Sequence, residues 1–302
     1  MPDRQPSLQK IRIIIAGGGT GGHLFPGISI AEEFLEQRSC DIRFVGTKNG
    51  IEKKVIPQSG FKLYTLPVSG LYRVGTRKKI IALAKLPFAF LKSLWILLSF
   101  RPHLVIGVGG YASGPMLALA VLFFKKTVIQ EQNAFPGMTN RILGKYIHLS
   151  FIPFPQSKDL FKNPVVVGNP IRKAIKSAAA QNKQKTDDNF VITIIGGSQG
   201  AHILNETLVK TLPLLEPISD RVQIIHQTGK KDYQWTISEY SKYPGINAEI
   251  SEFIEDMGLL YHKSHLLICR AGSMVNEIIA MGKASILVPI AVSSGNHQKE
   301  NA

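Results

Sequence analysis

The sequence predicts an α/β protein built from two doubly wound parallel sheets in tandem. An apolar, β-branched run is followed by a glycine cluster and then by a helical pattern, and this order recurs along the chain. The whole pattern restarts after a polar stretch at residues 173–189. The length of 302 residues is comfortable for two domains. We therefore expect one domain at residues 1–172 and a second at residues 173–302.

In the first half, a glycine-rich loop at residues 17–22 follows the first apolar run, and a glycine pair at 109 and 110 follows the third. The expected strands lie at residues 11–15, 41–45, 104–108, 127–130 and 165–167, with helices near 25–37 and 115–124. In doubly wound sheets, ligands bind at the carboxyl ends of the strands. The glycine clusters are therefore candidate binding loops.

In the second half, a glycine turn at residues 196–200 follows the first strand. The expected strands lie at residues 190–195, 222–226, 248–250, 266–269 and 284–288, with helices at 201–212 and from about 273 to 280. This repetition of the first half predicts a second nucleotide-binding type of domain.

Composition narrows the functional classes. Hydrophobic residues make up 44% of the chain and charged residues 19%, as in a protein with a packed core. Cys40 and Cys269 lie far apart without a CxxC spacing, which disfavours a disulfide framework or zinc site and suggests a reducing, cytoplasmic compartment. The net charge of +15 indicates an anionic partner, either a phosphate-bearing substrate or an anionic membrane face. Nucleic acid is disfavoured because no recognition motif accompanies the charge.

The segment at residues 78–100 is nearly long and apolar enough to span a bilayer. Lys85 and Lys92 lie inside it and Pro87 interrupts it, so spanning is disfavoured. Two interpretations stay open: a buried helix, or an apolar and basic surface that lies on a membrane. The second would use the flanking charges of Arg73, Arg77, Lys78 and Lys79.

The first glycine loop matches GxGxxG through Gly17, Gly19 and Gly22. A dehydrogenase would also need an acid at the end of the second strand, which instead runs into Lys48; this weakens the dehydrogenase interpretation without removing it. No Walker P-loop sequence occurs. His23 follows the loop, either as a structural or capping residue or as a general base where a substrate hydroxyl would arrive.

The second glycine turn presents Ser198 and backbone N–H groups at a helix N-terminus, a favourable geometry for a diphosphate, although a plain tight turn has the same sequence. Glu277 is suited to the hydroxyls of a ribose, or it complements a helix dipole. Arg172 at the domain junction either neutralises a phosphate or is an ordinary linker residue.

Several longer strings occur in a fixed order. They are GGGTGGHLFP at residues 17–26, GVGGYASGP at 107–115 and EQNAFPGMTN at 131–140, followed by GNPIR, GGSQGAHILNE, FIEDM, CRAG and HQKENA. This series resembles the MurG family of glycosyltransferases, from glycosyltransferase family 28. The resemblance implies a GT-B fold, with two Rossmann-like domains that face each other across a cleft.

The resemblance also implies an activity: inverting transfer of GlcNAc from UDP-GlcNAc to the C4 hydroxyl of MurNAc in lipid I, giving lipid II and UDP. The N-terminal domain would take the undecaprenyl-diphosphate-linked acceptor and the C-terminal domain the donor. Such an enzyme serves peptidoglycan synthesis, and through it cell shape and division. It would be peripheral, on the cytoplasmic face of the bacterial inner membrane, and the resemblance implies no metal and no cofactor.

The resemblance assigns site residues by motif. His23 and Glu131 are the expected catalytic residues, with His23 as the candidate base. Tyr111 and Asn140 are expected on the acceptor side. The expected donor-binding residues are Thr20, Gly21, Gly22, Asn133, Arg172, Ser198, Ile254, Ser273, Met274, Glu277 and Gln298.

The chain departs from the family pattern in two places. The string between CRAG and Glu277 is one residue shorter, which would rotate the helix start by about 100° and shift the contacts of Ser273 and Met274. A compensating insertion is expected at residues 291–296. Family members also continue beyond the HQ string, so we expect a fragment or a truncated form. The alternative function is therefore an impaired GT-B protein that binds only the UDP-sugar or the lipid.

Overall fold

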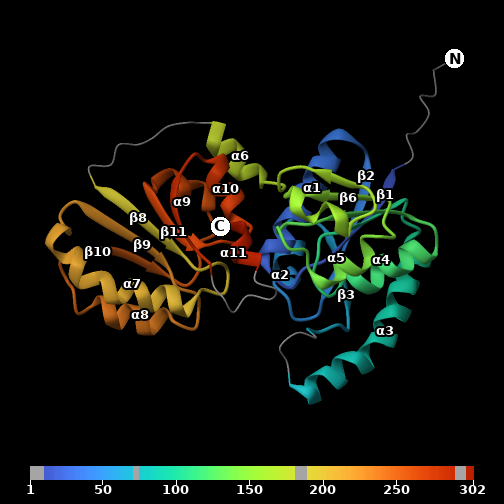
Figure 1. Cartoon of the computed structure of the whole chain (residues 1–302), viewed down its shortest axis with the longest axis horizontal. Helices are drawn as coiled ribbons and strands as arrows, with labels where there is room; N and C mark the ends of the chain where they lie inside the picture. Colours follow the sequence, from blue (N-terminus) through green and yellow to red (C-terminus); the bar gives the residue numbers. More distant parts are fainter. Residues whose placement is uncertain (1–9, 71–74, 181–188, 290–296) are drawn as a thin grey trace. The chain divides into compact units, whose positions relative to one another are not determined.

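The computed structural model describes residues 10–70, 75–180, 189–289 and 297–302, and the chain divides into two compact units (Figure 1). Unit 1 comprises residues 1–170 and unit 2 residues 171–302. The predicted insertion at residues 291–296 falls outside the described part. Each unit is described by itself below.

Unit 1 contains a seven-stranded parallel sheet with the strand order β3-β2-β1-β4-β5-β6-β7. The strands are β1 (Ile11–Ala16), β2 (Cys40–Thr47), β3 (Lys62–Leu66), β4 (Leu104–Gly107), β5 (Lys126–Gln130), β6 (Leu149–Ile152) and β7 (Pro164–Val166). The helices are α1 (Gly21–Gln37), α2 (Glu52–Gln58), α3 (Thr76–Phe100), α4 (Ser113–Leu122) and α5 (Met138–Leu143), with a 3-10 turn at Pro155–Leu160. The strand order reverses between β1 and β4, where a doubly wound sheet opens a crevice for ligands.

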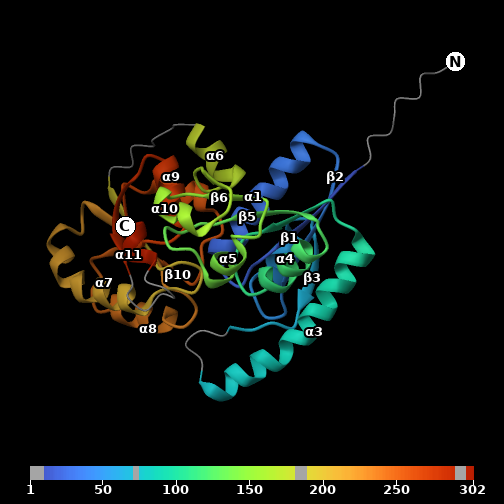
Figure 2. The same cartoon turned by 45° about the vertical axis from the view of Figure 1, so that its right-hand side comes forward.

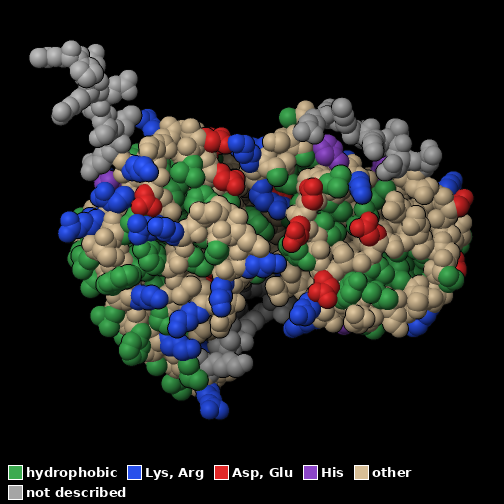
Figure 3. Space-filling view, turned by 180° about the vertical axis from the view of Figure 1, so that it is seen from behind, with side chains coloured by type: hydrophobic (Ala, Val, Ile, Leu, Met, Phe, Trp, Pro, Cys, Tyr) green, Lys and Arg blue, Asp and Glu red, His purple; other side chains and the backbone are tan. Residues whose placement is uncertain are grey.

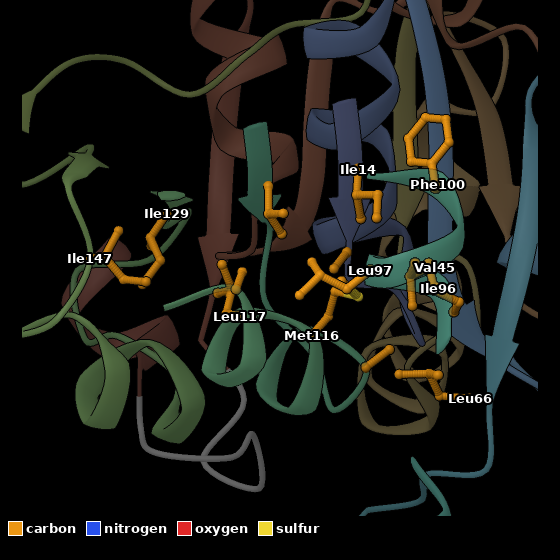
Figure 4. Packing of buried hydrophobic residues seen from close by; sticks show 14 of the residues in the cluster. Ile14, Val45, Leu66, Ile96, Leu97, Phe100, Met116, Leu117, Ile129 and Ile147 are labelled. Atoms are coloured by element: carbon orange, nitrogen blue, oxygen red, sulfur yellow. The ribbon is translucent and has the colours of Figure 1, made fainter. Parts of the chain in front are cut away.

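Both faces of this sheet are buried, which explains why its central strand is apolar without alternation. Along β1, Ile14 packs into one core cluster with Val45, Ile96 and Met116 (Figure 4). The neighbouring residues Ile13 and Ile15 pack into a second cluster with α1. Alternate residues of β1 thus contact opposite faces of the sheet, while the strand pairs in parallel with β2 and β4.

Helix α3 covers unit 1 with only one of its faces (Figure 2). Ala89, Ser93 and Ile96 on the inner face are fully buried. The outer face exposes large apolar side chains, namely Ile80, Ile81, Leu83, Phe88, Leu91, Trp95 and Leu98. The interpretation as a buried helix is therefore wrong for most of this segment.

Basic side chains surround this apolar face. Arg77, Lys79 and Lys85 are exposed on α3, and hydrophobic and basic side chains lie side by side over this part of unit 1 (Figure 3). Among the described residues, only Lys79–Phe100 is long and apolar enough to cross a membrane, by length and composition, with a mean hydropathy of 1.8. The inner face belongs to the core of unit 1, as a surface helix requires. Arg73 and the side chain of Lys78 lie outside the described part.

Unit 2 contains a five-stranded parallel sheet with the order β10-β9-β8-β11-β12, which reverses between β8 and β11. The strands are β8 (Phe190–Ile195), β9 (Val222–Gln227), β10 (Asn247–Ser251), β11 (Leu266–Arg270) and β12 (Ala284–Val288). The helices are α6 (Lys173–Ala180), α7 (His202–Leu215), α8 (Tyr233–Tyr240), α9 (Met257–Lys263), α10 (Met274–Ala280) and α11 (His297–Asn301), with a 3-10 turn at Glu216–Ile218. Two doubly wound parallel sheets confirm the predicted fold class.

Helix α1 differs from its prediction, because it begins at Gly21 rather than near residue 25. Thr20 is in an extended conformation at the N-cap, and the Leu24 N–H donates to the Thr20 carbonyl at 3.1 Å. Leu24 is fully buried, and this anchor holds the glycine-rich first turn in helical form. The sequence analysis also did not predict β3, which is five residues long, or β6, which is four residues long.

Candidate active site

The first candidate site lies at the switch point of unit 1, which is the place between β1 and β4 where the strand order reverses. The loops after β1, β4 and β5 meet there. The Gly17 N–H donates to the Val45 carbonyl at 2.9 Å and continues the β1–β2 ladder into the loop. Gly110, with φ of 81°, approaches so closely that an added Cβ would collide with the Gly18 carbonyl oxygen. Glycine is therefore required for the β1 and β4 loops to touch.

The carboxylate of Glu52 holds this loop in place, and no sequence motif pointed to this residue. Its side chain is 1% exposed, and it accepts hydrogen bonds from the Gly19 N–H at 2.9 Å and from the Thr47 N–H and hydroxyl at 2.7 and 2.8 Å. Gly18, Gly46 and Gly50 make room for the carboxylate, because a Cβ on any of them would collide with it. The signal that could have revealed it is an acidic first residue of a short helix after a glycine turn.

The first loop is thus held by an acid of the chain itself. The acid expected in a dehydrogenase is absent from the end of β2, and the Gly19 amide is already bound to Glu52. A carboxylate inside the loop also opposes a pyrophosphate there. These contacts weigh against the dinucleotide-binding interpretation.

His23 lies in the first turn of α1 and is partly buried. Its Nδ1 atom is 2.8 Å from the Gln132 Oε1 atom, in the loop after β5. A Cβ on Gly109 would lie 2.8 Å from Nδ1, so the glycine after β4 provides the space for the imidazole ring. The switch point therefore brings together His23, the β4 glycines and the EQN string.

Glu131 organises the loop at residues 131–140. Its Oε1 atom accepts from the N–H groups of Gln132 and Asn133 and from the Asn133 side chain, at 2.9, 3.0 and 3.2 Å. Its Oε2 atom accepts from the Gly137 N–H at 3.2 Å and from the Asn140 side chain at 2.8 Å. A carboxylate has about four lone-pair positions, so these donors saturate it. This favours a loop-organising role over proton transfer.

The expected acceptor-side residues differ in accessibility. Asn140 is 1% exposed, and its Oδ1 atom has no hydrogen-bond partner in the described structure. Tyr111, which follows the β4 glycines, is 40% exposed. Tyr111 is therefore accessible at the surface, whereas Asn140 is buried in the loop that its side chain helps to hold.

The second candidate site lies at the switch point of unit 2, between the loops after β8 and β11. The Gly200 N–H closes the turn onto the Gly197 carbonyl at 2.8 Å, and Ser198 within it is partly buried. Arg270, at the end of β11, donates from Nη1 to the Gly196 carbonyl at 3.3 Å, while its buried Nε atom has no partner in the described structure. Burial lowers the pKa of Arg270. An anion at this turn would satisfy the guanidinium.

Gln227 ties Ile254 to the same glycine turn. Its Nε2 atom donates to the Gly197 carbonyl and its Oε1 atom accepts from the Ile254 N–H, each at 3.0 Å. The backbone of Ile254 is therefore fixed beside the loop after β8, although the FIEDM string lies far along the chain from that loop.

Arg172 and Glu277 form a bidentate ion pair, which the sequence did not predict. Arg172 donates from Nε to Oε1 and from Nη2 to Oε2 of Glu277, each at 2.8 Å. The fully buried Tyr261 donates its hydroxyl to Oε2 at 2.9 Å. Burial lowers the pKa of Arg172, but the hydrogen bonds to Glu277 outweigh it and the net shift is upward. Burial and Glu277 raise the pKa of Tyr261, so its hydroxyl remains a donor.

The three bonds from Arg172 and Tyr261 to the Glu277 carboxylate form the Glu277 clamp. This clamp affects how the shortened string before Glu277 is interpreted. Helix α10 begins at Met274 with Ser273 as N-cap, and both residues are partly buried. Arg172 and Tyr261, which lie outside α10, both donate hydrogen bonds to the Glu277 carboxylate. The position of this carboxylate therefore does not depend only on the length of the loop before α10. Close by, the Asn301 side chain of α11 donates to the Ala271 carbonyl at 3.2 Å, and Gln298 on the same helix is buried.

Two family models match the chain, one over each unit. A model of the glycosyltransferase family 28 N-terminal domain matches residues 13–152, and a model of the C-terminal domain of the same family matches residues 191–302. The chain belongs to glycosyltransferase family 28. Each family model lies within one of the two units, the first covering the sheet of unit 1 from within β1 to β6, and the two sheets together give the GT-B fold class that the resemblance implied.

Individual relatives agree with the family models. An N-acetylglucosamine transferase of Syntrophus aciditrophicus is 47% identical, over 97% of this chain and 81% of the relative. A Geobacter protein of the same name is 42% identical, over 97% and 80%. The crystal structure of Acinetobacter baumannii MurG superposes with a TM-score of 0.71 at 27% identity, covering 96% of this chain and 82% of that one. The resemblance to the MurG family is therefore confirmed.

Among the described residues, no group of three or more His, Cys, Asp and Glu side chains is arranged to hold a metal ion. In unit 2, the Arg270 guanidinium lies at the turn after β8, whereas the Arg172 guanidinium is paired with Glu277.

Proposed function

We propose that this chain transfers GlcNAc from UDP-GlcNAc to the MurNAc C4 hydroxyl of lipid I, forming lipid II and UDP. One observation carries the proposal. Relatives at 39–47% identity over 97% of the chain bear the name UDP-N-acetylglucosamine--N-acetylmuramyl-(pentapeptide) pyrophosphoryl-undecaprenol N-acetylglucosamine transferase. The interpretation as an impaired binding protein is not favoured, because both switch-point loops and the Glu277 clamp are formed.

Unit 2 is assigned the donor. The turn at residues 196–200 offers Ser198 and backbone N–H groups to the UDP diphosphate, and the unsatisfied Nε of Arg270 supports an anion at this place. Ile254, Ser273, Met274 and Gln298 would complete the uracil and sugar contacts, Arg172 the diphosphate contact and Glu277 the ribose contact. On donor binding, Arg172 would exchange part of its bond to Glu277 for a phosphate oxygen.

Unit 1 is assigned the reacting groups. Thr20, Gly21 and Gly22 at the start of α1, together with Asn133, would contact the donor sugar, and Tyr111 the acceptor. His23 would take the proton of the attacking hydroxyl. Glu131 and Asn140 would hold the loop that carries Asn133 and Gln132. The departing diphosphate would be stabilised by fixed donors, without reorganisation during the reaction.

The acceptor is tethered to a bilayer, and we propose that the outer face of α3 docks there. The exposed apolar side chains Phe88, Leu91 and Trp95 would enter the interface, while Lys79 and Lys85 would meet anionic headgroups. The chain would then act as a peripheral enzyme on the cytoplasmic face of the inner membrane.

One assay tests the function. The purified chain is incubated with labelled UDP-GlcNAc and a lipid I analogue, and the labelled disaccharide lipid is quantified. We expect product formation that stops on removal of the acceptor. UDP binding without any turnover would instead support the impaired protein, and titration with NADPH gives no fluorescence change if the dehydrogenase interpretation is wrong.

A further inference from the structure

The contact between His23 and Gln132 determines which imidazole nitrogen carries the proton. Gln132 is 2% exposed, and its Nε2 atom donates to the main-chain carbonyl of Gln130 at 3.0 Å. A carbonyl oxygen only accepts, so the amide nitrogen must face it, and the amide oxygen must face His23.

The orientation of the Gln132 amide also determines which nitrogen of the His23 ring carries the hydrogen. Gln132 Oε1 only accepts, and it lies 2.8 Å from His23 Nδ1. Nδ1 must therefore carry the hydrogen, which leaves the lone pair of the neutral imidazole on Nε2. His23 is only partly buried, so part of the residue remains accessible.

Gln132 is itself held in place by a buried amide network. Its main-chain carbonyl accepts from the Asn169 side chain at 2.9 Å, and the Asn169 oxygen accepts from Gln130 Nε2 at 3.3 Å. Asn169 belongs to the GNPIR string, and its side chain and that of Gln130 are both buried. A network in which each polar group has its partner orients its members rigidly.

We propose that Gln132 is a positioning residue that holds His23 in the tautomer with hydrogen on Nδ1, so that Nε2 is the catalytic base. The proposal rests on the transferase function above. In the reaction, the acceptor O–H bond breaks and its proton passes to Nε2. The acceptor oxygen forms a bond to C1 of GlcNAc, while the C1–O bond to UDP breaks and its electron pair leaves with UDP. Gln132 Oε1 then faces the N–H of an imidazolium, which it stabilises as an acceptor.

A double-mutant cycle on kcat separates this role from a structural one. Gln132→Met keeps the side-chain length but removes the acceptor, and we expect a fall in kcat of about tenfold to hundredfold with unchanged affinity for UDP. In a His23→Ala background, the same substitution should have no further effect, because no tautomer remains to be selected.

Gln130→Met is the matched control. It removes a buried amide from the same network but leaves the main-chain carbonyl that orients Gln132. We expect it to change kcat by a similar factor whether His23 is present or replaced through His23→Ala. The proposal is overturned if Gln132→Met leaves kcat unchanged, or lowers it equally in both backgrounds.

Gln132→Glu provides a second variant that keeps the volume and an acceptor toward His23, and it gives up the N–H that Gln132 donates to the Gln130 carbonyl. Its negative charge favours the imidazolium, so the acidic limb of the kcat profile should move to higher pH. An unmoved limb would contradict the contact, even if Gln132→Met fails to fold. If His23→Ala alone retains full kcat, His23 is not the catalytic base and the positioning role of Gln132 is also wrong. Product formation by the unchanged chain would still support the transferase function.

Discussion

The ion pair between Arg172 and Glu277 gives the sharpest test of the site in unit 2. The two side chains are only 21% and 13% exposed, and Tyr261 occupies a further position on the same carboxylate. Removing one partner of a buried pair costs about 3–5 kcal/mol, because the remaining charge is left without compensation. The slight exposure of this pair places the expected cost of Arg172→Met near the lower end, at about 3 kcal/mol.

Fluorescence can report on unit 2 alone. The chain contains two tryptophans, Trp95 in unit 1 and Trp235 in unit 2, so a Trp95→Phe background leaves Trp235 as the reporter. With a slope of about 2 kcal/mol per molar urea, Arg172→Met should lower the unfolding midpoint by about 1.5 M. Glu277→Leu alone should cost a similar amount, and the double variant much less than the sum.

The exposed pair between Lys242 and Glu239 in the same unit is the matched control. Its Lys242 side chain is 59% exposed, and we expect a coupling of at most about 0.5 kcal/mol. For Arg172 and Glu277 we expect a coupling of about 2 kcal/mol or more. Single variants that add within about 0.5 kcal/mol would refute the clamp, and with it the idea that Glu277 is placed from outside its own loop.

Three further predictions follow from buried groups and the α3 surface. Burial lowers the pKa of His226 from 6.5 to about 4, so the unfolded chain binds its proton first as pH falls through that window. The stability that neutral His226 contributes at pH 7 should be about 2 kcal/mol smaller at pH 5, and His226→Gln should remove this pH dependence from the urea midpoint. Glu52→Gln places an N–H donor against the donors of the first glycine loop; we expect a lower kcat with unchanged UDP affinity by calorimetry, whereas the exposed Glu33→Gln should change neither. Phe88→Ser with Trp95→Ser should reduce sedimentation with phosphatidylglycerol vesicles about tenfold or more, while Leu214→Ser on unit 2 should not; equal binding by all variants would contradict docking through α3.

The sequence predicted the fold class well because parallel strands buried on both faces are apolar and short, and glycine clusters mark their ends. The central strands were found within one or two residues. Strands β3 and β6 and the early start of α1 were missed, because a short strand and a glycine-rich first turn have weak local patterns. Their conformations depend on neighbours such as the core around Leu24.

The candidate site was predicted unevenly. Motif strings pointed to His23, the two glycine loops, Arg172 and Glu277, since these residues stand next to strand ends. The strings did not indicate that Glu52, Tyr261 and Arg270 are hydrogen-bond partners. A hydrogen bond between residues far apart in the chain produces no local sequence spacing that could be recognised. The pairing of Arg172 with Glu277 spans 105 positions in the chain.

The sequence alone determined that two glycine-bearing α/β sheets follow one another and that a family of sugar transferases shares their strings. Periodicity and glycine placement are local properties, so they can be read without coordinates. Only the tertiary structure decided which groups are already occupied: Glu131 is saturated by its own loop, Glu277 is clamped, and Gln132 assigns the proton of His23 to Nδ1. Those outcomes depend on the direction of hydrogen bonds between distant segments, which folding alone brings within reach.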